Sequence, residues 1–531
     1  MIAHRNEYHA LDRPRGSALL LALVVSILLI LTMAAIVSTT QSLGKHTRWR
    51  VEQTRALALA EGVTESAQRR MLVQVANFQP PDLSGTITIN STDYTYTAVP
   101  VGSSYTQTDP DGVQRNVQHY EVSATVQSGE GHATVARVID LTTTPIFQYM
   151  IFYNDDLEIL PGPDMLLAGR VHSGGDMYVG SRRTLTVDTE YFRCTGGILR
   201  KRKNDGSTTS GAIDIKVTSE STFVDMDSTH DATFPGWVNY ALDTWKGTVK
   251  DGAHGVKAVA APNVGSIKAF LPDSVTKGYY HDNADLVIIN GTTVDANGNG
   301  VTLPAGTVQE LTMYDGREGR YVTVTEVDIA LLNASGEFPA NGLIYAYRTD
   351  STTTQPNGIR ITNGAELLSP LTVVSEDPVY IHGDYNTVNK KGAAVISDAV
   401  NLLSSAWNDS KGPGDLPLAA DTTYNLAFIT GIVPTPNGGG DYSGGFENLP
   451  RFHEDWSDKS ARIRGAFINI FASELATSPW RYGGDLYKAP LRDWQYDPAL
   501  NDPNNLPPFT PDAVYFERVL WDDRIALPFA L

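Results

Sequence analysis

The feature that most constrains this chain is an apolar stretch near its N-terminus. No charged side chain occurs between Arg15 and Lys45, and residues 18–37 are almost entirely hydrocarbon. At a helical rise of about 1.5 Å per residue, this stretch covers roughly 30 Å, the thickness of the hydrocarbon core of a bilayer. Arginines precede it, so the positive-inside rule places residues 1–16 in the cytoplasm and everything after Lys45 outside. We therefore expect a large extracytoplasmic protein carried on one N-terminal helix.

Three interpretations of this stretch differ in its fate. A secretory signal peptide has an apolar region of only about 7–15 residues, whereas here the run is longer and residues 41–70 still look helical. A plain signal anchor remains open. The third interpretation depends on Arg15 and Gly16, which stand directly before the apolar run. A basic leader that ends in Gly and is followed at once by such a helix resembles a type IV prepilin leader.

This resemblance implies a specific processing step and specific partners. The prepilin peptidase would cut between Gly16 and Ser17 on the cytoplasmic side. The apolar helix would stay in the inner membrane until it packs among other pilins or pseudopilins. The large side chains expected to make these contacts are Leu19, Leu20, Leu21, Leu23 and Leu28.

A second motif and one departure refine the resemblance. Residues 55–62 read Arg-Ala-Leu-Ala-Leu-Ala-Glu-Gly, which is similar to a segment of PilX-type minor pilins at a comparable distance from the leader. Pilins usually carry Glu at the fifth mature residue, but counting from Ser17 that position is Leu21. An uncharged fifth residue resembles tip-type pseudopilins, so the resemblance implies a place at the end of a filament.

The helix is expected to continue well beyond the membrane. Apolar and small residues recur at spacings of three and four along one face, and Pro80 and Pro81 end the pattern because neither donates a backbone hydrogen bond. We predict one helix over residues 17–78, with residues 17–38 in the membrane. The residues of the apolar face are Leu57, Ala60, Thr64, Ala67, Met71, Val75 and Phe78.

Residues 79–144 supply a partner for this one-sided helix. They contain four strand-like pieces in which β-branched and aromatic residues alternate with polar ones, separated by Gly-, Asp- and Asn-rich turns. We predict a four-stranded antiparallel sheet that covers the helix, the shape of a pilin head. The four pieces are 85–89, 94–99, 120–126 and 133–139.

The remaining residues, 145–531, differ in the pattern of their apolar segments. Apolar pieces of four to six residues alternate with Gly, Asn and Asp, and no strict repeat length emerges. Very short strands with frequent corners favour a β-solenoid-like body, and a β-sandwich is the alternative. A helix is expected over residues 394–405, where apolar side chains gather on one side. Several phrases of this region resemble large pilin-like surface proteins of environmental bacteria, which implies an architecture and no activity.

Composition limits the function. The formal net charge is −19, which argues against nucleic acid as a partner because phosphates require clustered Lys and Arg. The basic run 200–203 stands beside Asn, Asp and Gly and is predicted to be a solvated loop. The single cysteine, Cys194, is expected to be a buried small hydrophobe. Asp315, Glu318 and Asp384 offer carboxylates for cleaving polysaccharide, but any acidic chain of this size offers such pairs, so we predict no enzyme.

Two local patterns are candidate binding sites. Asp295, Asn297 and Asn299 match the alternating oxygen ligands of a calcium loop, although Gly306 replaces the expected Glu at the twelfth position. The missing Glu favours the alternative interpretation, a plain Asn/Gly-rich turn. No other cofactor or metal is expected.

The C-terminal region is rich in aromatic residues. Exposed rings of Trp480, Tyr482 and Trp494 would stack on a surface glycan. The alternative is that these rings bury apolar area to pin irregular loops to the body.

We thus predict an α+β protein: a leader (1–16), a long helix (17–78), a sheet (79–144) and a mostly-β body (145–531). The expected function is that of a minor pilin or pseudopilin, at the tip of a type IV pilus or type II secretion filament, for assembly or surface attachment. It would reside in the inner membrane with a periplasmic or extracellular body, and reach the pilus or cell surface after assembly. The alternative is a permanently membrane-anchored β-solenoid that binds or cleaves polysaccharide.

Overall fold

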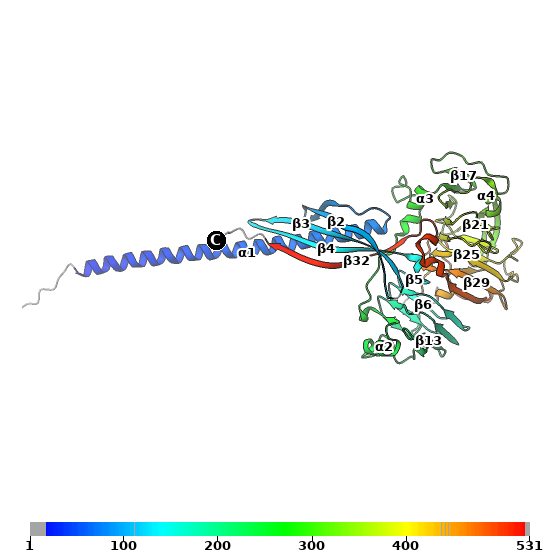
Figure 1. Cartoon of the computed structure of the whole chain (residues 1–531), viewed down its shortest axis with the longest axis horizontal. Coiled ribbons are helices and arrows are strands. Elements are labelled where there is room, and N and C mark those ends of the chain that lie inside the picture. The colour runs from blue at the N-terminus through cyan, green and yellow to red at the C-terminus, as the bar shows by residue number, and fades with distance from the viewer. Residues whose placement is uncertain (1–16, 111, 437, 441, 444, 526–531) are drawn as a thin grey trace, which may run out of the picture.

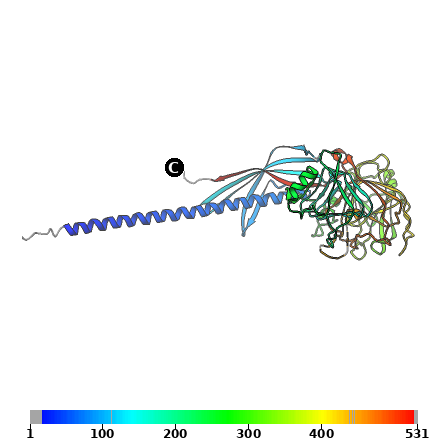
Figure 2. The ribbon, with the colours of Figure 1, turned by 90° about the horizontal axis from the view of Figure 1, so that it is seen from below.

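The computed structural model describes residues 17–525 apart from 111, 437, 441 and 444, and its parts are a long helix, a head sheet and a β-rich body (Figure 1). Helix α1 (Ser17–Ala76) runs unbroken for 60 residues, about 90 Å. Its N-terminal half extends away from the molecule, and its C-terminal half lies along the sheet (Figure 2). The helix ends slightly before the predicted residue because Phe78 adopts a left-handed φ of 59°. The predicted leader, 1–16, lies outside the described residues.

The head sheet is antiparallel and has five strands where the sequence predicts four. The four predicted strands are present, and the fifth, β32, comes from the C-terminal region and pairs with β4 from Asp512 opposite Pro145 to Ile525 opposite Ala133. The prediction that residues 512–525 belong to the body was therefore wrong, because the local sequence of a strand does not indicate which distant strand it pairs with. In spatial order the strands are β1 (Ser84–Ile89), β2 (Thr92–Thr108), β3 (Gln114–Ser128), β4 (Gly131–Pro145) and β32 (Asp512–Ile525).

Small side chains let α1 lie close to this sheet. The buried residues of its C-terminal half recur every three or four positions and form one stripe, which packs on the apolar face of β2, β3 and β4. Alanines dominate the stripe, so the helix backbone approaches the strands closely. The apolar members are Ala56, Ala60, Val63, Ala67 and Met71.

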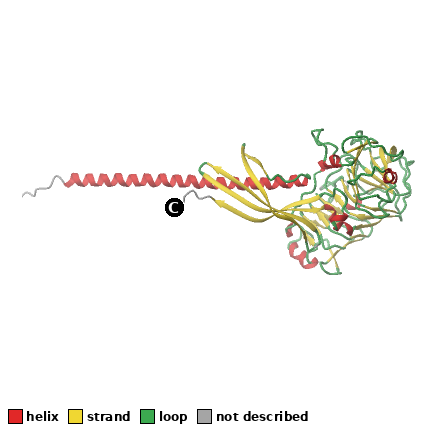
Figure 3. Cartoon of the chain, turned by 45° about the horizontal axis from the view of Figure 1, so that its top comes forward, coloured by secondary structure: helices red, strands yellow, loops and turns green. Residues whose placement is uncertain are grey.

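The body is inserted between β4 and β32, so the chain enters and leaves it beside the same edge of the head sheet. Figure 3 shows that the body consists mainly of strands and loops, with short helices at its periphery. Those helices are α2 (Trp237–Trp245), α3 (Tyr279–Asn283) and α4 (Ile329–Ser335), and the 3-10 turns are η1 (Ile146–Gln148), η2 (Gly252–His254), η3 (Val264–Ile267), η4 (Phe446–Asn448), η5 (Pro498–Asn501) and η6 (Pro503–Asn505).

The first half of the body forms three parallel ladders from successive coils of about 20 residues. The antiparallel β14 (Phe223–Asp225) ends the third ladder, and α2 packs beside β15 at the end of the first. The ladders are β5 (Ile151–Tyr153), β8 (Val171–Ser173), β11 (Phe192–Cys194), β15 (Val249–Lys250); β6 (Leu157–Ile159), β9 (Met177–Val179), β12 (Ile198–Leu199); and β7 (Met165–Leu167), β10 (Thr184–Val187), β13 (Ala212–Lys216).

The corners between these coils repeat in their chemistry. Asp156 Oδ1 accepts a hydrogen bond from the backbone N–H of Asp176 at 2.8 Å, and Asp176 Oδ1 accepts one from Gly197 at 2.8 Å. A Cβ on Gly174 would lie 2.1 Å from the Asn154 carbonyl oxygen, so the corner requires glycine there. Cys194, at the end of β11, is buried as predicted.

The second half of the body stacks onto the first. Its strands continue the β5 ladder through β30, which pairs in parallel with β5, and they add two further ladders. The continuing ladder is β16 (Leu286–Ile289), β20 (Leu343–Tyr347), β22 (Leu371–Val374), β24 (Ala393–Ser397), β27 (Ala427–Thr430) and β30 (Phe467–Asn469), with β17 (Thr292–Asp295) antiparallel at its edge. The first added ladder is β18 (Val308–Asp315), β19 (Arg320–Asp328), β21 (Gly358–Thr362), β23 (Val379–His382), β25 (Val400–Leu403) and β28 (Arg451–Phe452). The second added ladder is β26 (Thr422–Asn425), β29 (Ser460–Gly465) and β31 (Leu491–Tyr496).

The order of strands shows how the body closes. The first coils run outward from β5 to β15, and the later coils run from β16 back to β30, so the first and last coils meet. Parallel pairing between successive coils does not fit the antiparallel sandwich. The predicted helix over 394–405 was also wrong: β24 and β25 occupy it, and both are buried throughout. Two short buried strands joined at a corner mimic the helical spacing of apolar residues.

Candidate functional site

The N-terminal half of α1 exposes a continuous apolar surface. The five leucines singled out in the sequence, Leu19, Leu20, Leu21, Leu23 and Leu28, are each more than half exposed. Among the described residues, α1 is the one helix long and apolar enough to cross a membrane. Surfaces of this kind are unstable in water and require a bilayer or other apolar helices as a partner.

Several hydroxyl side chains in this half are hydrogen-bonded to the helix itself. Ser26 Oγ donates to the Ala22 carbonyl at 2.8 Å, Thr32 Oγ1 to Leu29 at 2.9 Å and Thr40 Oγ1 to Ile36 at 2.8 Å. An unpaired hydroxyl would cost several kcal/mol in hydrocarbon, on the order of 2–7 kcal/mol. These bonds therefore leave the surface suited to an apolar environment on all sides.

The predicted cleavage position falls at the start of the described helix. Ser17 is the first residue of α1, whereas Gly16 lies outside the described residues. Leu21, the fifth residue from Ser17, is 68% exposed, so it faces whatever surrounds the helix. Cleavage between Gly16 and Ser17 stays a prediction.

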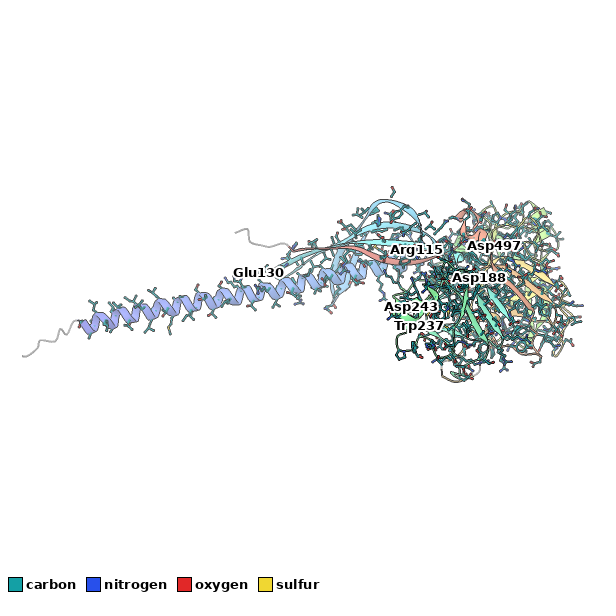
Figure 4. The ribbon with its side chains drawn as sticks, turned by 60° about the horizontal axis from the view of Figure 1, so that its bottom comes forward. Arg115, Glu130, Asp188, Trp237, Asp243 and Asp497 are labelled. Atoms are coloured by element: carbon teal, nitrogen blue, oxygen red, sulfur yellow. The ribbon has the colours of Figure 1, made fainter. Side chains whose placement is uncertain are left out.

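On the C-terminal side of the exposed half, polar contacts attach the β3–β4 hairpin to α1. Gln53 Nε2 donates to the His132 carbonyl at 2.7 Å, and the His132 N–H donates to Gln53 Oε1 at 3.0 Å. The adjacent Glu52 accepts from the Glu130 N–H at 2.8 Å and from Arg48 at 3.0 Å. Figure 4 shows Glu130 beside the helix. Both hydrogen bonds to Glu52 favour its charged form, the backbone one most, and lower its pKa.

The predicted calcium loop forms a turn stabilised by its own side chains. Asp295 Oδ1 accepts from the backbone N–H groups of Asn297 and Asn299 at 2.9 and 2.8 Å. Its second oxygen accepts from the Asn299 side-chain amide at 2.9 Å. The side-chain hydrogen bond from Asn299 is the largest cause of the lowered Asp295 pKa. This geometry agrees with the turn interpretation, and calcium binding stays a prediction.

The prediction of exposed, glycan-stacking rings is wrong for two of the three aromatic residues. Trp480 and Trp494 are 0% and 1% exposed. The Trp480 indole N–H donates to the Ala476 carbonyl at 3.1 Å, and the Trp494 ring stacks on Phe467 with centroids 5.4 Å apart. Both rings bring apolar area into the core of the second half of the body, as the alternative interpretation holds.

Tyr482 differs from these tryptophans because it is 55% exposed. It lines a cleft of about 500 Å³ together with four arginines that the sequence analysis did not assign to a site: Arg182, Arg202, Arg481 and Arg492. The one sequence signal for this cleft was the basic run 200–203, which includes Arg202 and which we expected to be a solvated loop. That expectation was wrong for Arg200, which is 4% exposed and donates to the Met226 carbonyl at 3.1 Å.

Two of the three carboxylates considered for catalysis, Asp315 and Glu318, lie in a closed, ion-paired cluster, whereas Asp384 is exposed. The side chains of Asp315 and Glu318 are 0% and 3% exposed. Arg451 faces Glu318 with Nη1 and Oε1 2.7 Å apart, and Tyr380 donates to Asp315 at 2.6 Å. Burial would raise the pKa of Asp315, but facing positive groups and the Tyr380 hydrogen bond lower it to about 2. A polysaccharide has no access to this pair, so these carboxylates do not form a cleavage site.

The fold and the exposed helix define an α+β protein with an N-terminal segment suited to a membrane. No protein-family model matches the chain, and no curated protein matches it. Among solved structures, the chain is similar to the crystal structure of the competence-associated pilin ComZ from Thermus thermophilus, with 9% identity over 90% of this chain and 97% of that chain. The TM-score is 0.23, and we therefore draw no conclusion from this likeness.

Proposed function

We propose that the chain is a minor-pilin-like component of a type IV pilus or type II secretion filament. One observation supports this proposal most: α1 is a single helix with two environments, an exposed apolar half and a half docked under an antiparallel sheet. The apolar half would anchor the protein in the inner membrane and would later pack among the helices of other pilins or pseudopilins. The body would then lie in the periplasm or outside the cell.

A place at the tip is the form of this proposal that suits the chain best. The body is much wider than α1 and lies at the far end of the molecule (Figure 1), so copies repeated along a shaft would clash. Leu21 stands where shaft pilins usually carry Glu. At the tip the protein would start assembly or hold the body out for surface attachment. Gold-labelled antibody on sheared filaments tests this position: label along the shaft would contradict it.

The decisive experiment is the N-terminal sequence and mass of the protein from cells with and without prepilin peptidase. We expect a chain that starts at Ser17 only when the peptidase is present. Gly16→Asp should block the cut, and Ser17→Ala, which keeps a small residue, should preserve it. An intact leader in both strains would contradict the pilin proposal.

A second function follows if the leader is not cut. The protein would then be a permanently anchored β body that binds or cleaves polysaccharide. The open cleft beside Tyr482 favours binding. Cleavage has no comparable support, because Asp315 and Glu318 are enclosed. The peptidase experiment separates the two functions, since an anchor needs no processing.

A further inference from the structure

We infer that the cleft beside Tyr482 binds an acidic saccharide, one that carries carboxylates on its sugar rings. This inference rests on the proposed function, in which the body is displayed for attachment. The cleft lies where the two halves of the body meet, because Arg182 and Arg202 come from the first half, and Arg481 and Arg492 come from the second. It therefore exists only when the first and last coils are stacked.

The charge of the cleft is opposite to that of the chain. The whole chain has a net charge of −19, yet four arginines line this one hollow and Glu447 is its one acidic residue among those described. Glu447 is already engaged, because it accepts from the Tyr442 hydroxyl and from the Leu160 N–H. A positive site of this kind attracts a carboxylate.

Two of the arginines are suited to a new acceptor. Arg182 is exposed, and in the described part of the chain no side-chain partner holds its guanidinium. Arg492 donates one Nη2 hydrogen bond to the Glu447 carbonyl at 3.0 Å, which fixes its guanidinium at the wall of the cleft. Planar guanidinium groups form paired hydrogen bonds with carboxylates.

The tyrosines give the cleft a flat apolar wall. The Tyr487 hydroxyl donates to Asn448 Oδ1, and Tyr482 packs edge-on against the Tyr487 ring with centroids 5.3 Å apart. Tyr482 is thus supported from one side and open on the other. At about 500 Å³, the cleft falls within the range of roughly 300–1,000 Å³ usual for small-ligand sites, so it accommodates a short stretch of sugar rings.

An acidic saccharide suits these features better than nucleic acid does. A nucleic acid carries a phosphate at every residue and needs a continuous basic track, whereas the arginines here are confined to one cleft of an acidic chain. A saccharide with carboxylates presents charge at the ring edges and apolar C–H faces to an aromatic side chain. The cleft offers both kinds of contact.

The test is calorimetric titration of the full chain in detergent micelles with tetragalacturonate, and with the uncharged galactose tetrasaccharide as a reference. We expect binding of the acidic tetramer only. Arg182→Glu and Arg202→Glu should each weaken it about tenfold or more, while the control Arg183→Glu, an exposed residue 4.0 Å from Asp164 and outside the cleft, should change it less than twofold. Tyr482→Ala should weaken binding about fivefold, and Tyr321→Ala, an equally exposed tyrosine on β19, should not.

Three outcomes would overturn the inference: equal binding of the neutral tetramer, equal loss with Arg183→Glu and Arg182→Glu, or tighter binding of a single-stranded oligothymidylate through the same arginines. Failure here is distinguishable from failure of the proposed function. A chain that is processed at Ser17 but ignores tetragalacturonate refutes only the ligand, and a chain that binds the saccharide with its leader intact refutes only the pilin role.

Discussion

The two halves of α1 share one continuous backbone and differ in almost everything else. The N-terminal half carries large apolar side chains all around, and they are exposed. The C-terminal half carries one narrow stripe of mostly small residues, and that stripe is buried against the head sheet. The difference indicates two kinds of partner. Large side chains on every face suit a bilayer or a bundle of other helices, whereas alanines suit the flat surface of a sheet.

Substituting one methionine in each half of α1 tests the difference between the halves with the largest expected effect. Met71 is 0% exposed in the stripe, and Met33 is 68% exposed in the apolar half. We expect Met71→Ala to lower the opening free energy of the head by about 2–5 kcal/mol, because it leaves a cavity under the sheet. Met33→Ala should change it by less than about 0.5 kcal/mol. Hydrogen exchange of β3 and β4 in detergent micelles measures this quantity. Equal effects would mean that the two halves are not distinct.

A pair of glutamines tests the polar contacts between helix and hairpin. Gln53→Ala leaves both the N–H and the carbonyl of His132 without their helix partner, so the opening free energy of the β3–β4 hairpin should fall by about 1–3 kcal/mol. Gln41→Ala, at an exposed position of the other half, should leave it unchanged. Exchange of peptides around His132 gives the result. No change with Gln53→Ala would show that water replaces the side chain without cost.

The sequence predicts the parts of the fold that depend on local pattern. Uniform apolarity and the Pro80-Pro81 pair give the helix almost to its last residue, and alternation gives four of the head strands. It fails where a partner is remote or a pattern is ambiguous. β32 pairs with a strand on the other side of the inserted body. Residues 394–405 have a spacing that two short buried strands share with a helix.

The candidate sites divide in the same way. Tyr482 was found because an aromatic residue among Pro and Asp is visible in a sequence. Trp480 and Trp494 have the same local signal, yet burial separates them from Tyr482, and only packing decides burial. The cleft arginines were missed because Arg182 and Arg492 belong to coils that meet only when the chain returns to its starting strand.

Substituting one glycine in each half of α1 tests the same difference with a smaller expected effect on stability. A Cβ on Gly62 would lie 3.6 Å from Ile89 Cδ1, an ordinary contact, and one on Gly44 would meet nothing within 4 Å. Alanine is favoured over glycine inside a helix by about 0.5–1 kcal/mol. Gly62→Ala should therefore raise the opening free energy of the head by up to about 1 kcal/mol, and Gly44→Ala should leave the head unchanged. Hydrogen exchange of β1 and β4 checks both, and a loss of head stability with Gly62→Ala would show that Ile89 does not tolerate the methyl group.

The smallest effect concerns pH and the docking of the hairpin on Glu52. Its lowered pKa, caused first by the Glu130 N–H and then by Arg48, means that the folded protein favours the charged carboxylate. The stabilising contribution is therefore complete above the ordinary pKa, near 4.5, and is lost as the pH falls through the lowered value. We expect exchange at Glu130, corrected for its intrinsic pH dependence, to accelerate as the pH falls below about 4.5, with the β1–β2 hairpin as internal control. Glu52→Gln should remove this dependence. If the acceleration persists in that variant, another group holds the hairpin against the docked half of α1.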